Sequence, residues 1–177
     1  MNNTKKLTTL GILGALSVLL VSIIHFPIFP AAPFLEYDPA DIPILIGTFL
    51  FGPVSGFLLT VVASIVQGVT VSSSSGIIGI VMHIVSTGTF VLIAGNFYKC
   101  NKTKETAAAG LIMGALGMAL VMTLWNLLLT PIFMNVPRTV VLNMMLPTII
   151  PFNVIKAVVN AVITFFLYKS ISLFVKK

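Results

Sequence analysis

The stretch Glu36-Tyr-Asp-Pro-Ala-Asp41 holds three of the four acidic residues of this 177-residue chain. On both sides of it the sequence is almost entirely apolar: 58% of all residues are hydrophobic and only 8% are charged. A soluble domain carries about 25% charged residues. The composition therefore predicts an integral membrane protein, with the acidic stretch in a loop between membrane spans.

The apolar blocks on either side of this loop predict an all-α membrane protein with six transmembrane helices. A span needs about 20 apolar residues, and glycine and proline mark the interruptions between the blocks. An outer segment is expected at residues 131–150, and the spans are expected at residues 7–24, 42–51, 54–71, 77–97, 107–129 and 151–174. The second helix is the shortest and is expected to be tilted or buried, with Asp41 as its N-cap.

The dipeptide Gly52-Pro53 decides between five spans and six. If residues 42–71 formed one kinked helix, there would be five spans and the termini would lie on opposite sides. If Gly52-Pro53 is a tight turn, there are six spans and both termini are cytoplasmic. We prefer six, because cytoplasmic flanks collect lysine and arginine. This arrangement leaves only Arg138 in an outer loop and places inside Lys5, Lys6, Lys99, Lys102, Lys104, Lys169, Lys176 and Lys177.

Length and composition also limit the function. Six spans use up residues 1–177, so a single transmembrane domain is expected, with no separate soluble domain. The net charge of +6 lies mostly at the ends of spans, which suits lipid headgroups rather than nucleic acid. One cysteine, Cys100, excludes an internal disulfide and a cysteine metal cluster, and no metal site is expected.

Motifs for catalysis are missing from the sequence. It has no phosphate-binding loop, no H-E-x-x-H zinc motif and no G-x-S-x-G nucleophile elbow. The chain is therefore not expected to be an enzyme. If it is a transporter, it has no energy-coupling motif of its own and must take its energy from a partner.

Polar side chains inside the spans are the candidate binding residues, because they are costly in a bilayer. Asn153 and Lys156 share one face of the last helix, and with Asn126 they are expected to form a donor-rich pocket near the outer surface. The alternative is that Lys156 extends to the headgroups while the asparagines join helices. Gln67 and His83 form a second group, and the alternative role for His83 is a hydrogen bond between helices.

The first helix carries two small residues four positions apart, Gly11 and Ala15. Small residues at this spacing allow another helix to approach closely. The pattern indicates a docking surface for a partner helix.

Three segments carry a resemblance to a known family: Leu35-Glu-Tyr-Asp-Pro-Ala-Asp-Ile-Pro43, Phe51-Gly-Pro-Val-Ser-Gly56 and Ile150-Pro-Phe-Asn-Val-Ile-Lys156. Together with Phe26-Pro27 and Pro30, and with the spacing between them, they cover most of the chain. They resemble the substrate-binding (S) subunits of energy-coupling-factor (ECF) vitamin transporters, in particular the riboflavin-specific branch.

The resemblance implies a multi-pass protein of the bacterial plasma membrane that binds riboflavin at the extracellular side. Riboflavin would be the transported ligand, and no cofactor is expected. Asn126, Asn153 and Lys156 would bind the flavin, and the loop around Leu35 to Asp38 would close over it. Gly11 and Ala15 would dock on the transmembrane coupling protein, which two ATPase subunits drive.

Two other functions remain open. The region from Gln67 to His83 also suits an S subunit for another small vitamin or metabolite. The third hypothesis is an intramembrane enzyme or a structural assembly protein that uses His83 and the serines Ser72–Ser75. It is the least favoured of the three, because no oriented nucleophile–base pair is evident.

Overall fold

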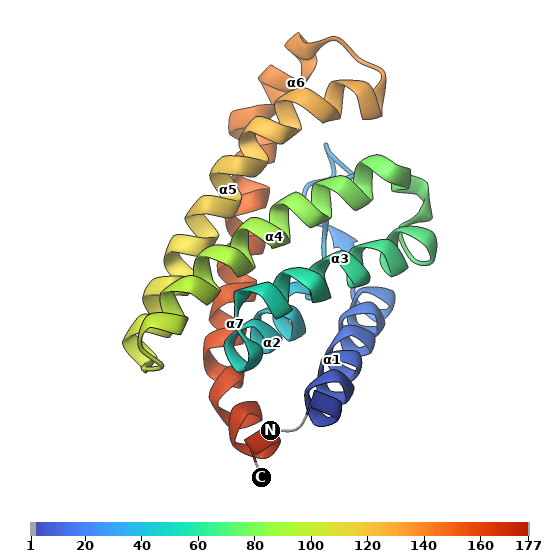
Figure 1. Cartoon of the computed structure of the whole chain (residues 1–177). Coiled ribbons are helices and arrows are strands. Elements are labelled where there is room, and N and C mark those ends of the chain that lie inside the picture. The colour runs from blue at the N-terminus through green and yellow to red at the C-terminus, as the bar shows by residue number, and fades with distance from the viewer. Residues whose placement is uncertain (1–2, 177) are drawn as a thin grey trace.

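A computed structural model describes residues 3–176, and most of this range is helical (Figure 1). The α-helices are α1 (Asn3–Ile23), α2 (Asp41–Phe51), α3 (Pro53–Val69), α4 (Gly76–Cys100), α5 (Lys104–Met134), α6 (Arg138–Met144) and α7 (Ile150–Lys176). A 3₁₀ turn, η1 (Ser73–Ser75), precedes α4, and a π-helical segment, η2 (Met145–Ile149), joins α6 to α7. The two-residue strands β1 (Phe26–Pro27) and β2 (Glu36–Tyr37) pair antiparallel, with Phe26 opposite Tyr37.

Within residues 3–176, four helical segments are long and apolar enough to cross a membrane: α1, α4, α5 and the continuous stretch Arg138–Ile171. Helices α2 and α3 are apolar but have only 11 and 17 residues. The short second helix is therefore confirmed. That six segments span the bilayer, with both termini cytoplasmic, stays a prediction. Figure 1 shows the two termini at the same end of the molecule.

Helix α2 is short and lies inside the molecule. It contacts α1, α3, α4 and α7, and Ile44 and Leu45 are completely buried. A helix that is apolar on all sides belongs in a core. The helix ends at Gly52, whose φ of 91° favours glycine, and Pro53 begins α3 at once. The tight turn expected at Gly52-Pro53 is confirmed.

The prediction that Asp41 caps α2 is wrong. The helix begins at Asp41 itself, and the N-cap position belongs to Ala40, which has no side-chain cap bond. The Asp41 carboxylate is fully buried and accepts hydrogen bonds from Thr87 and Asn160 instead. The carboxylate is thus bonded by side chains on distant helices and not by the backbone at the start of α2. A rule based on neighbouring residues in the sequence does not predict such partners.

The boundaries expected for the outer segment at 131–150 are largely wrong, because helical structure extends into it from both sides. Helix α5 continues through Pro131 to Met134, and the chain reverses over Asn135, whose φ of 52° is left-handed. From Arg138 the chain is helical again, and the wider π turn accommodates Pro147, which has no amide hydrogen to donate. Only a short connection separates α5 from the helical run that leads into α7.

Two apolar clusters hold these elements together. The larger one surrounds α2 and includes Leu45, Phe90 and Met118. The second lies at the opposite end from the termini, where Leu35 and Tyr37 pack with residues of α6, η2 and α7. The second cluster fixes the long connection between α1 and α2 against the start of α7.

Candidate ligand-binding site

One cavity is lined by all seven side chains that the sequence suggested as ligand contacts: Leu35, Asp38, Gln67, His83, Asn126, Asn153 and Lys156. They come from the α1–α2 connection and from α3, α4, α5 and α7. The contributing ends of these helices lie away from the termini (Figure 1). Counted out to its open mouth, the empty space is about 1040 Å³.

The α5–α7 side of the cavity carries two buried amides. Asn126 donates through Nδ2 to the Met122 carbonyl at 2.7 Å, and its Oδ1 accepts from Thr130 at 2.9 Å. Asn153 donates through Nδ2 to the Ile149 carbonyl at 2.8 Å. Bonds to the preceding helical turn fix both amides. Each Nδ2 keeps a second hydrogen, and the acceptors also have capacity left for a ligand.

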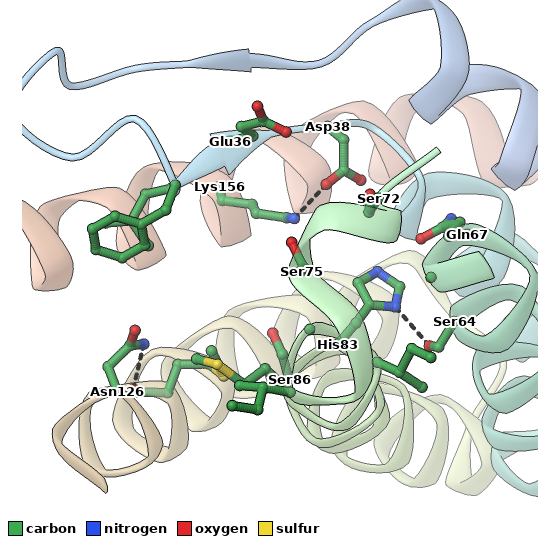
Figure 2. Close-up of a pocket in the computed structure, with 18 of the residues that line it drawn as sticks. Glu36, Asp38, Ser64, Gln67, Ser72, Ser75, His83, Ser86, Asn126 and Lys156 are labelled. Atoms are coloured by element: carbon green, nitrogen blue, oxygen red, sulfur yellow. Dashed lines mark hydrogen bonds and ion pairs between the residues drawn. The ribbon is translucent and has the colours of Figure 1, made fainter. Parts of the chain in front are cut away.

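Lys156 forms a buried ion pair with Asp38, with Nζ 2.7 Å from Oδ2. Figure 2 shows the lysine side chain reaching from α7 to the loop above the cavity. The alternative in which Lys156 extends to the headgroups is therefore wrong. An ammonium has three donors, so Lys156 keeps two hydrogens after the bond to Asp38.

The charge of Lys156 sets the ionisation of Asp38, which lies in the connection outside the helices. Burial alone would raise the pKa of the Asp38 carboxyl, but the Lys156 ammonium, the nearby His83 and the Ala40 amide together outweigh burial and hold the pKa below its ordinary value. The amide of Ala40 also donates to Asp38 Oδ1 at 3.0 Å. Both interactions favour the carboxylate form.

The α3–α4 side of the cavity is rich in hydroxyl groups. His83 Nδ1 lies 2.7 Å from Ser64 Oγ (Figure 2), and its Nε2 lies 3.6 Å from Asp41 Oδ1. The hydrogen bond between helices that was the alternative for His83 is thus present, although the ring also lines the cavity. Gln67 donates to Ser17 at 3.3 Å. The further hydroxyl groups on this side belong to Ser72, Ser75 and Ser86.

Apolar side chains complete the walls. Phe34 and Leu35 of the connection face the cavity together with Met118, Met122 and Phe152. A site of this kind, with apolar walls and a few fixed polar groups, is typical of small-molecule binding.

The sequence did not predict that Tyr37, Asp41 and Asn160 form a buried network next to this cavity. Asn160 accepts from the Tyr37 hydroxyl at 3.0 Å and donates to Asp41 Oδ2 at 3.0 Å. A usable signal was present, because Asn153, Lys156 and Asn160 follow at intervals of three and four residues. That spacing places all three on one face of α7.

The two small residues of α1 lie elsewhere. Gly11 and Ala15 are both exposed, and a Cβ added at Gly11 would meet nothing within 4 Å. The α1 surface around them is apolar, with Ile12 62% exposed. The structure leaves this surface open, and its role in docking stays a prediction.

Comparison with known proteins defines the class. The family of ECF transporter substrate-specific components matches residues 5–168, and the chain belongs to this family. A solved structure described as "Structure and mechanism of the S component of a bacterial ECF transporter" superposes with a TM-score of 0.84 at 29% identity, covering 99% of this chain and all of that one.

The named relatives are riboflavin transporters. The chain is 30% identical to riboflavin transporter RibU of Staphylococcus aureus (strain TCH60) over 187 residues, covering all of this chain and 95% of the relative. It is 26% identical to riboflavin transporter FmnP of Bacillus subtilis (strain 168), over 90% of this chain and 87% of the relative. These relatives are membrane transport components and not enzymes, so the chain is a non-enzymatic membrane protein, as predicted.

Proposed function

We propose that this chain captures riboflavin in the cavity between α3, α4, α5 and α7. A tricyclic ring suits the apolar walls, and its carbonyls and the ribityl hydroxyls suit a few fixed donors and acceptors. The observation that carries the proposal is the pair of buried amides, Asn126 and Asn153, fixed in the cavity wall opposite a side rich in hydroxyl groups. The names of the relatives support a flavin as the ligand.

The cavity is proposed to face the outside of the cell. Lys5 and Lys6 lie at the start of α1, Lys99 and Lys104 flank the α4–α5 turn, and Lys169 lies late in α7. These positions belong to the end of the molecule that carries the termini (Figure 1). Because basic residues collect on the cytoplasmic side, the opposite end, with the cavity, would be extracellular.

Import is proposed to need the other subunits of an ECF transporter. The chain has no phosphate-binding loop with which to hydrolyse ATP. A transmembrane coupling protein would dock on α1 at Gly11 and Ala15, and two ATPase subunits would drive the release of the vitamin inside.

Riboflavin titration of the detergent-purified protein tests the proposal. The single tryptophan, Trp125, adjoins Asn126 in α5, so a bound flavin is expected to quench its fluorescence in a saturable way. Bound ligand should also raise the Tm by mass action. The variant N153L keeps the side-chain size but removes the amide, and it should weaken binding by about tenfold or more.

The control is N143L, the same change at an exposed asparagine of α6. It should bind riboflavin as the unchanged protein does. The proposal fails if riboflavin gives no saturable signal, or if N153L and N143L bind equally well.

A different cargo is the second candidate. The observation in its favour is that the α3–α4 side of the cavity carries three serine hydroxyls beside His83, from Ser72, Ser75 and Ser86. These groups would also bind another vitamin or metabolite rich in hydroxyls. Native mass spectrometry of the purified protein distinguishes riboflavin from a different cargo. A co-purified ligand other than a flavin would support the different cargo.

A further inference from the structure

Asn160 lies one helical turn after Lys156 on α7 and is completely buried. It is not among the residues that line the cavity. Its side chain nevertheless contacts three residues of one short segment, Tyr37–Asp41. Oδ1 accepts from the Tyr37 hydroxyl, while Nδ2 lies 3.3 Å from the Asp38 carbonyl and 3.0 Å from Asp41 Oδ2.

We propose that Asn160 is a positioning residue for ligand capture, holding the Tyr37–Asp41 segment on α7 in the register at which Asp38 meets Lys156. This inference rests on the proposed function, because it assigns Asn160 a part in the same site. Lys156 and Asn160 share one face of α7. The lysine binds the Asp38 side chain and the asparagine binds the Asp38 backbone.

Only an amide satisfies all three contacts. An amide accepts at one atom and donates at the other, as the Tyr37 hydroxyl and the Asp41 carboxylate require. An aspartate at position 160 would have no donor when ionised and would place a second carboxylate against Asp41. A buried unpaired charge is strongly unfavourable.

Other bonds fix the same segment and show how closely its position is set. Ser17 of α1 donates to the Ala40 carbonyl at 2.8 Å, and Thr87 of α4 donates to Asp41 Oδ1 at 2.6 Å. Three helices therefore hold this one short segment. Asn160 differs from the other two anchors because it reaches both ends of the segment and also the backbone of Asp38.

The position of this segment bears directly on the cavity mouth. Asp38 of this segment lines the cavity, as do Leu35 and Glu36 directly before it, so a shift of the segment moves part of the cavity wall. Loosening the segment is expected to speed ligand dissociation more than it slows association, because the mouth is open already and the wall is what retains the ligand.

Exchanging the carboxylate and the amide between positions 41 and 160 tests the inference. N160D places two carboxylates together and should weaken riboflavin binding by about tenfold or more, mainly through faster dissociation. The double variant N160D/D41N restores a donor opposite the carboxylate, since the amide introduced at position 41 can donate to the carboxylate introduced at position 160. It should recover most of the affinity but not all, because the Asp38 carbonyl still lacks its donor.

All of these side chains have nearly the same size, so recovery in the double variant cannot come from packing. D41N alone completes the thermodynamic cycle. N143D, at an exposed asparagine of α6, is the matched control and should bind as the unchanged protein does.

Amide hydrogen exchange of the ligand-free protein gives a second readout. Exchange in a peptide covering residues 35–41 should be faster in N160D and slow again in N160D/D41N. Equal exchange in N160D and the unchanged protein, or no recovery in the double variant, overturns the inference. If the unchanged protein does not bind riboflavin, the proposed function fails while the exchange pattern still decides the role of Asn160.

A milder change covers the case in which N160D does not fold. Y37F removes only the hydroxyl that donates to Asn160 Oδ1. It should raise exchange in the same peptide by a smaller factor. Unchanged exchange in Y37F would also count against the inference.

Discussion

At the scale of single residues, the Asp38–Lys156 pair shows that two costly groups in the cavity depend on each other. Each side chain is only about a tenth exposed, at 11% and 10%. A buried ion pair adds little net stability over apolar residues, but removing one partner leaves an uncompensated charge. The two residues should therefore behave as a unit in mutational experiments.

This dependence predicts a non-additive cycle. K156M should lower the free energy of unfolding by about 3–5 kcal/mol, because it leaves Asp38 buried and unpaired. K156M/D38N should cost less than K156M alone, since no lone carboxylate remains. Denaturant unfolding of the ligand-free protein measures both values. Additive losses would show that the pair is not coupled.

The lowered pKa of Asp38 predicts a dependence on pH. A carboxyl whose pKa is lower in the folded state stabilises that state above its unfolded pKa, and the contribution is lost as the pH falls through the folded value. The Tm difference between the unchanged protein and D38N should thus stay constant from pH 7 to about 5 and shrink below about pH 4. A difference already lost at pH 6 would contradict this assignment.

The sequence was most informative about which polar residues lie inside and least informative about their partners. The cost of polar groups in a bilayer singled out Asn126, Asn153 and Lys156, and all three line one cavity. The partner of Lys156 lies 118 positions away in the chain. No pattern along the sequence shows such a contact. For the same reason the sequence predicts an N-cap at Asp41, whereas its carboxylate is buried and bonds to distant helices.

At the scale of the elements, proline and glycine predicted some boundaries and misled at others. Gly52-Pro53 ends α2 and begins α3 as expected, because the backbone there requires a positive φ. The sequence predicts the end of a span near Pro131, yet Pro131 lies inside α5, and Pro147 lies within the π-helical segment η2. Neighbouring helices and π turns in membrane proteins satisfy the backbone groups that proline leaves free, and the sequence alone does not show where this happens.

The close approach of α2, α3 and α4 depends on glycine and gives a prediction for helix packing. A Cβ added at Gly95 of α4 would lie 2.6 Å from Thr48 Cγ2 and 3.0 Å from the Pro53 Cα. Because backbone cannot move aside easily, G95A should destabilise the protein by about 1–3 kcal/mol. Thermal unfolding measures the effect. G11A is the matched control, since that position is open, and an equal loss in both variants would contradict the packing argument.

At the scale of the whole molecule, the polar cavity and a closed aromatic cluster lie in opposite halves. Phe49, Tyr98 and Tyr168 pack together near the end with the termini, with ring centroids 4.6 Å to 5.8 Å apart. They belong to, or pack against, the large apolar core around α2. A ligand in the cavity therefore faces packed side chains on the side nearer the termini. Release toward the termini would need movement of the whole subunit or of its helices, which agrees with a dependence on partners.

Binding and transport should consequently be separable by changes on α1. Gly11 and Ala15 are exposed and do not line the cavity, to which Val21 near the end of α1 and His25 just after α1 contribute. G11L/A15L should leave riboflavin affinity unchanged in the purified subunit, because neither residue touches the cavity. It should abolish riboflavin uptake by cells that contain the complete transporter, since bulky side chains prevent a close helix approach.

The control is V62L, a change at an exposed apolar position on α3 that keeps a similar surface, and this variant should support uptake. Normal uptake by G11L/A15L would place the docking surface elsewhere, and reduced affinity in the isolated subunit would mean that α1 shapes the cavity itself.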